Sequence, residues 1–179
     1  MSKAIRSWLL VVFLAFSAGA LAHKVDDPAK YVTTRLSVTG LVENRLDLSV
    51  DDLKTLPQQQ FAEVPIVNHE GKANTTLRKV RGVLLRDILT KAVIKSTDHG
   101  DIKRMAIIAT ASDGYVALYS SGEVLNSPLG DGILVFYENA GKQLADADGR
   151  IAMVSVRDNK TGFRHVRWLK NIEVRKLVD

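Results

Sequence analysis

The chain reads Gly149-Arg150-Ile151-Ala152-Met153-Val154-Ser155-Val156 and then Arg157-Asp158-Asn159-Lys160-Thr161-Gly162-Phe163-Arg164-His165-Val166-Arg167-Trp168. The first part is an apolar run typical of a buried strand. The second part is a loop dense in Arg, Lys, Asn and Gly that leads to an aromatic-bearing strand. Guanidinium groups bind planar anions and stack on flat rings. We therefore expect this loop to hold a polar ligand that is anionic or heteroaromatic.

The N-terminus carries the features of a secretory signal peptide over residues 1–22. Lys3 and Arg6 precede the apolar run Trp8–Phe16, and small residues follow it up to Ala22. A run of about nine residues is well short of the roughly 20 that a transmembrane helix requires. The small residues that end at Ala22 suit cleavage by a signal peptidase. We expect the mature protein to begin at His23 and to reside in a bacterial periplasm.

Residues 23–179 have the length and composition of one globular domain. The chain contains no cysteine, which excludes disulfides, thiolate metal sites and cysteine nucleophiles. The 25 basic residues are interspersed with 20 acidic ones, so no basic block points to a nucleic acid. No motif pairs a nucleophile with a base, and we predict no catalytic residues and no metal ligands.

Hydrophobic periodicity predicts an α+β domain with mixed β-sheets and short helices. Ser49, Asp51 and Asp52 favour the start of a short helix that ends before Pro57. Apolar residues at helical spacing predict a second helix over 83–93, entered through Arg81-Gly82. We expect strands over 35–42, 61–67, 105–110, 115–119, 133–137, 151–156 and 172–174.

Several segments, in order, resemble the molybdopterin-binding domain of the sulfite oxidase family. They are 38–42, 48–53, 81–87, 112–115, 134–137, Arg150 and 162–164, so the resemblance spans about residues 35–175. It implies the α+β fold of that family, with a molybdenum-bearing pterin in a pocket of loops. It also implies a cysteine thiolate on the metal, in the loop after the strand 61–67. Here that loop reads Val67-Asn68-His69-Glu70 and has no thiol.

Because neither an amide nor a neutral imidazole replaces a soft thiolate on molybdenum, we predict that the protein binds a pterin without the metal. The chain resembles a cysteine-less branch, the small periplasmic pterin-binding regulators of the PruR type. That similarity implies a pterin ligand of the tetrahydropterin type. It further implies a contact with the periplasmic domain of a membrane sensor, beside enzymes that make or destroy cyclic di-GMP.

Nine residues are candidates for binding the pterin. They supply hydrogen bonds, positive charge, close backbone approach or an aromatic wall, and each also has a purely structural interpretation as turn, ion pair or core. They are Asn68, His69, Asp113, Tyr115, Arg150, Gly162, Phe163, Arg164 and Trp168.

Two other interpretations remain open at this point. One is a molybdenum-cofactor-dependent oxidoreductase in which molybdopterin holds the metal through its dithiolene alone. The other is an interaction domain whose pocket no longer binds anything.

Overall fold

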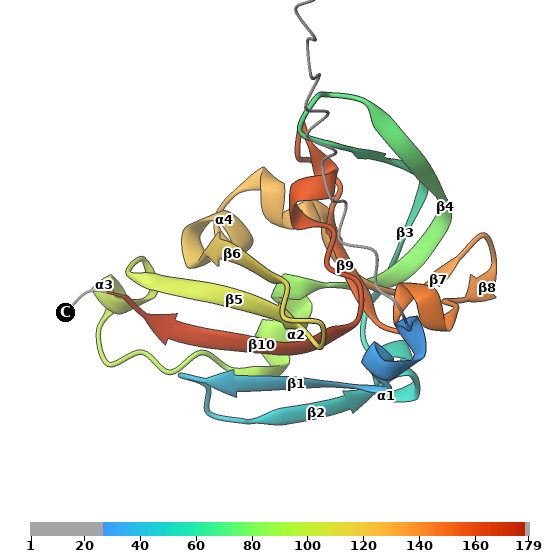
Figure 1. The fold of residues 1–179 in the computed structure, drawn as a ribbon. Helices are drawn as coiled ribbons and strands as arrows, with labels where there is room; N and C mark the ends of the chain where they lie inside the picture. Colours follow the sequence, from blue (N-terminus) through green and yellow to red (C-terminus); the bar gives the residue numbers. More distant parts are fainter. Residues whose placement is uncertain (1–26, 178–179) are drawn as a thin grey trace, which may run out of the picture.

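A computed structural model describes residues 27–177 as two five-stranded β-sheets with short helices between the strands (Figure 1). The predicted signal peptide, residues 1–22, and the first residues after it lie outside the described part of the chain. No helix of the described part is long and apolar enough to cross a membrane. The α+β class and the single domain are as predicted.

The first sheet has the strand order β2-β1-β10-β5-β6. β1 and β10 run parallel, although they lie at opposite ends of the chain, and the other neighbours are antiparallel. The last strand, β10, therefore lies in the middle of the sheet, between β1 and β5. The bounds are β1 Arg35–Gly40, β2 Leu46–Ser49, β5 Met105–Ala111, β6 Val116–Ser120 and β10 Leu169–Lys176.

The second sheet is built on a long hairpin that bends around the loop after β9 (Figure 1). Its order is β3-β4-β7-β8, and β9 pairs with the other side of β7. The bounds are β3 Gln58–Val67, β4 Ala73–Leu84, β7 Ile133–Asn139, β8 Lys142–Gln143 and β9 Ala152–Ser155.

The prediction of a helix over 83–93 is corrected at its start. Val83 and Leu84 are still in strand β4, paired with β3 or β7, and the helix α2 spans only Leu85–Ala92. Val83, Leu84 and Leu85 are all buried, and the apolar run continues from the end of β4 into the start of α2. The sequence analysis assigned no strand to 73–82, because β4 is largely polar there and alternates only weakly.

The remaining helices are short. Ser49 caps α1 through a reciprocal pair of hydrogen bonds with Asp52, as the sequence predicted. The bounds are α1 Val50–Lys54, α3 His99–Ile102 and α4 Ser121–Leu125, with 3-10 turns η1 Pro28–Tyr31, η2 Pro128–Gly132, η3 Asp146–Asp148 and η4 Thr161–Arg164.

The larger core cluster joins the first sheet, α2 and one face of the second sheet. A smaller cluster, which includes Val64, Ile66, Phe136 and Val154, covers the other face of the second sheet. β7 and β9 are thus apolar on both faces, as a central strand should be. The smaller cluster supports the hairpin and the loop that carries η4.

Candidate pterin-binding site

The loop with η4 is fixed to the end of β3. The Thr161 hydroxyl donates to the carbonyl of Pro65 at 2.5 Å and accepts from the amide of Val67 at 2.8 Å. At Gly162 a Cβ atom would lie 2.8 Å from the carbonyl oxygen of Val67, so a side chain here would push the two segments apart. Lys160 adds a hydrogen bond to the carbonyl of His69. The loop that sequence analysis singled out therefore packs against the loop where the family places its thiolate.

A polar cleft of about 470 Å³ lies beside this junction. Its walls come from β3, β4, the end of β7, η3 and the segment after η4. The lining residues are Ile66, Asn74, Thr75, Leu77, Asn139, Asp148, Gly162, His165 and Arg167. Amide, hydroxyl, carboxylate, imidazole and guanidinium groups thus face one space, which is the mixture a flat heterocycle with a donor and acceptor edge requires.

His165 provides an uncharged edge to the cleft. Its ring stacks on Phe136, with 6.1 Å between the ring centroids and 20° between the planes. Burial, with the nearby cation of Arg167 as a second cause, lowers the pKa of His165 to about 4. The imidazole is therefore neutral at pH 7, with one ring nitrogen to donate and the other to accept.

Arg167 provides the positive charge of the cleft, and its guanidinium group lies over the ring of Trp168. The guanidinium carbon of Arg167 lies 4.5 Å from the centre of the Trp168 ring. Trp168 itself is buried, its indole N–H donates to the carbonyl of Asp146 at 2.8 Å, and its ring meets Tyr31. Trp168 is therefore a core residue that positions Arg167, and it is not part of the cleft wall.

Arg164 is held within the protein by two carboxylates. It makes two hydrogen bonds to Asp158, at 2.7 and 2.5 Å, and an ion pair with Glu123 of α4 at 2.7 Å. Its guanidinium also lies 4.4 Å from the ring centre of Tyr119. The hydrogen bonds to Asp158, above all, raise the pKa of Arg164. Its charge is already matched, so Arg164 fixes the shape of the loop and leaves Arg167 as the cation of the cleft.

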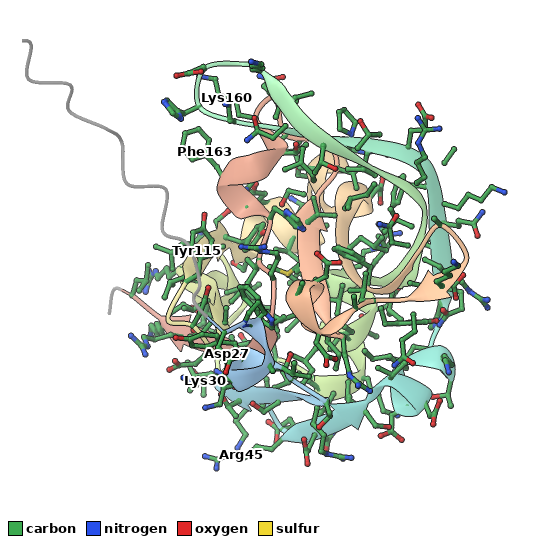
Figure 2. All side chains as sticks on the ribbon, turned by 45° about the vertical axis from the view of Figure 1, so that its right-hand side comes forward. Asp27, Lys30, Arg45, Tyr115, Lys160 and Phe163 are labelled. Carbon is green, nitrogen blue, oxygen red and sulfur yellow. The ribbon has the colours of Figure 1, made fainter. Side chains whose placement is uncertain are left out.

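Phe163, Tyr115 and Asp113 lie on the side of η4 that faces the turn between β5 and β6. Figure 2 shows Tyr115 and Phe163 there, with Lys160 beyond them. The Tyr115 hydroxyl donates to the carbonyl of Phe163 at 2.6 Å, and Asp113 accepts the backbone amide of Tyr115 at 3.0 Å. The Asp113 carboxylate thus shapes the turn, and the Phe163 ring is exposed. None of these three residues lines the cleft.

Asn68 and His69 belong to the hairpin loop that η4 contacts. The Asn68 side chain accepts the amides of Glu70 and Lys72 at 3.0 Å each, which closes the turn between β3 and β4. The His69 side chain is exposed and lies 3.8 Å from Glu70. Both residues stand next to the junction with η4.

Arg150 lies away from this group. It has a left-handed backbone with φ 58° and pairs with Asp146 at 3.0 Å. Its side chain faces a separate polar hollow of about 270 Å³ that also includes Thr34 and Lys54. Of the nine candidates, Gly162 alone lines the 470 Å³ cleft.

Sequence reasoning missed most of the cleft lining. His165 and Arg167 were in the quoted loop, and their alternation with buried Val166 and Trp168 was the signal available. Asn74, Thr75 and Asn139 carried no signal, because pairing across the second sheet is what brings them together.

The donor set of the cleft suits the organic part of a pterin and does not suit molybdenum. The whole chain has no thiolate, and the part that the structure describes has no group of three or more side chains able to hold a metal ion. A neutral imidazole and a carboxylate are harder ligands than the thiolate of the family.

Two mixed sheets, with a long bent hairpin in the second sheet and a polar cleft near the turn of that hairpin, are the architecture of a molybdopterin-binding class of domain. The chain belongs to the family described as "Oxidoreductase molybdopterin binding domain", whose model matches residues 22–178. The predicted family and fold are thereby confirmed.

Among solved structures, the chain is similar to the sulfane dehydrogenase SoxCD from Paracoccus pantotrophus, with a TM-score of 0.62 and 16% identity. The match covers 84% of this chain and 39% of the SoxCD chain, so the present chain corresponds to well under half of that protein. At this identity the likeness concerns the fold. No curated protein is significantly similar to the chain.

Proposed function

We propose that this protein is a non-catalytic, periplasmic pterin-binding protein. In this proposal it senses a tetrahydropterin and relays the signal to the periplasmic domain of a membrane sensor that makes or degrades cyclic di-GMP. One combination of observations carries the proposal. The family fold and a polar cleft at the η4 junction are retained, while the sequence has no cysteine to bind molybdenum.

The cleft residues would recognise a pterin by complementary chemistry. Asp148 would accept hydrogen bonds from the amino and amide N–H groups on the pyrimidine edge, as carboxylates do for guanidine-like groups. Neutral His165 and Asn139 can each donate and accept, and Arg167 would balance an anionic substituent. None of these roles requires a metal.

A molybdenum-cofactor-dependent oxidoreductase is the second candidate. Membership of the family favours it, as does the likeness to a sulfane dehydrogenase. The absence of cysteine weighs against it, because the protein then offers the metal no thiolate.

The test is to express the chain with its N-terminal segment in a bacterium that makes molybdenum cofactor, and to purify it from the periplasm. Metal content and released pterin fluorescence are measured on the same sample. Pterin without molybdenum supports the proposal, whereas molybdenum near one per chain replaces it with the oxidoreductase. A preparation without pterin that also fails to bind micromolar tetrahydropterin refutes both.

A matched pair of variants tests the site itself. Arg167→Ala removes a cation that lines the cleft. Arg45→Ala removes an exposed cation at the opposite end of the molecule, as Figure 2 shows relative to Lys160. We expect Arg167→Ala to weaken pterin binding by about tenfold, the worth of one charge-assisted hydrogen bond, and Arg45→Ala to leave it unchanged. Equal binding by both variants would move the site away from this cleft.

A further inference from the structure

The edge strand β6 differs from the other edges of the two sheets. β2 carries Asp47 in an ion pair with Arg35, β3 carries Glu63 and Pro65, β8 has two residues, and the outer side of β9 is bridged to Val166. Charges, proline and short length are the usual means by which proteins prevent a free edge from pairing with another chain. β6 reads Val116-Ala117-Leu118-Tyr119-Ser120 and has none of them.

The backbone of β6 is open on its outer side. The amide of Ala111 donates to the carbonyl of Tyr115, and the register then directs the groups of Ala117 and Tyr119 towards β5. The N–H and C=O groups of Val116 and Leu118 must therefore point away from the sheet. Within residues 27–177, β6 pairs with β5 alone.

The side chains beside this edge are apolar, and two basic side chains lie next to them. Val116 is 50% exposed, Leu118 61% and Leu177 65%. An apolar hollow of about 420 Å³ includes Leu118 and Leu177, and Lys103 and Arg104 stand at its rim. Neither cation forms an ion pair with any residue in the described part of the chain.

The charge of the chain helps to identify what would cover this edge. The formal net charge is +5 for the whole chain and +3 for residues 23–179, which lack Lys3 and Arg6, so two copies repel each other, whereas a segment with carboxylates is attracted to Lys103 and Arg104. An extended segment would satisfy the open backbone groups, and apolar residues at alternate positions would pack on Val116 and Leu118.

β6 is also linked to η4 at both of its ends. The Tyr115 hydroxyl, just before β6, bonds to the carbonyl of Phe163. Near the other end the ring of Tyr119 lies beneath Arg164, and its hydroxyl is 3.0 Å from that of Ser155 in β9. A ligand that orders η4 would therefore also order the edge strand.

We infer that β6 is a docking strand for an extended, acidic segment of a partner protein, which adds to the first sheet by β-strand pairing. The partner segment has apolar residues at alternate positions and a carboxylate that meets Lys103 or Arg104. The docking does not depend on a pterin. Its regulation through η4 rests on the proposed function and gives the signal a route from the cleft to the partner.

The test uses the purified protein and a phage-displayed library of random short peptides. We expect the enriched peptides to alternate apolar residues and to contain Asp or Glu. Their affinity, measured by fluorescence polarisation, should fall by about tenfold or more in Leu118→Lys, which adds the edge charge that β6 lacks. Leu129→Lys, at an exposed apolar position in η2, is the matched control and should bind like the wild type.

Hydrogen exchange locates the bound peptide. The amides of Val116 and Leu118 should become protected when the peptide binds. Absence of enriched peptides, equal affinity for Leu118→Lys, or protection elsewhere would overturn the inference. So would a wild-type dimer in light scattering that becomes a monomer in Leu118→Lys, since β6 would then pair with a second copy. An unchanged circular dichroism melt verifies that the variants are folded.

A second arm separates the docking strand from the proposed function. We expect 6-methyltetrahydropterin to change the peptide affinity by at least about threefold in the wild type and not in Tyr115→Phe, which lacks the bond to Phe163. If the pterin does not bind while the peptide does, the proposed function fails and the docking strand stands. If the pterin binds and the peptide does not, the docking strand alone fails.

Discussion

Arg164→Met should destabilise the protein strongly, because Arg164 balances two carboxylates in a poorly hydrated site. Its side chain is 19% exposed, and Asp158 and Glu123 are similarly shielded. Met replaces the aliphatic part of the arginine side chain, so the change removes mainly the guanidinium group, including its contact with the Tyr119 ring. The two carboxylates are then left without their cation.

The expected loss is about 3 kcal/mol in the free energy of unfolding. Breaking a fully buried ion pair by removing one partner costs about 3–5 kcal/mol, and the lower end applies because these side chains keep some contact with water. Arg150→Met is the matched control. Its pair with Asp146 is a single contact and the Arg150 side chain is 44% exposed, so we expect a loss below about 1 kcal/mol.

Urea unfolding at pH 7, followed by circular dichroism, measures both variants. Adding Asp158→Asn to Arg164→Met should restore part of the lost stability, since one of the two unpaired charges disappears. A loss below about 1 kcal/mol for Arg164→Met, together with weaker pterin binding, would refute this reasoning and return Arg164 to the ligand site.

Three further predictions concern stability. The pKa of His165 is lowered from 6.5 to about 4 in the folded protein, so the unfolded chain takes up this proton first as pH falls. The free energy of unfolding of the wild type should therefore fall by about 2 kcal/mol between pH 7 and pH 5, a loss that His165→Gln should not show. An equal change of urea stability with pH in both proteins would contradict this prediction. Tyr119→Phe leaves the buried Ser155 hydroxyl without its 3.0 Å partner and should cost about 1–2 kcal/mol by thermal unfolding, and a neutral result would show that another group replaces the phenol. Gly149→Ala places a Cβ 2.4 Å from the Trp168 backbone at φ +87°, which should cost about 2–4 kcal/mol or prevent soluble expression; a variant as stable as the wild type would show that this turn can relax.

Local patterns predicted the elements that local energetics determine. The capping residues of α1 and the apolar runs of β5, β7 and β9 were recognised because each follows from its own side chains. β4 was missed over its whole length, since neighbouring strands and not its own composition make it a strand. The parallel pairing of β1 with β10 was equally beyond local reasoning, because it joins residues more than a hundred positions apart.

The candidate site shows the same division. The loop around η4 was found from its density of Arg, Lys and Gly, but the prediction chose Arg164 as a ligand residue and gave Arg167 no role. Arg164 has carboxylate partners in Glu123 of α4 and Asp158, whereas Arg167 faces the cleft. Sequence spacing cannot distinguish these two arginines, because the partner from α4 comes from a distant segment.

The proposed function requires a pterin site that does not depend on a metal ligand, and the contacts at η4 bear on this requirement. η4 is fixed to β3 through Thr161, Gly162 and Lys160, and these contacts use hydroxyl, backbone and ammonium groups. None of these contacts uses a thiol. Loss of the thiolate therefore removes the metal's ligand but leaves the walls of the cleft in place. The proposed function requires binding of the organic ring alone, and no contact that fixes η4 to β3 depends on a metal ligand.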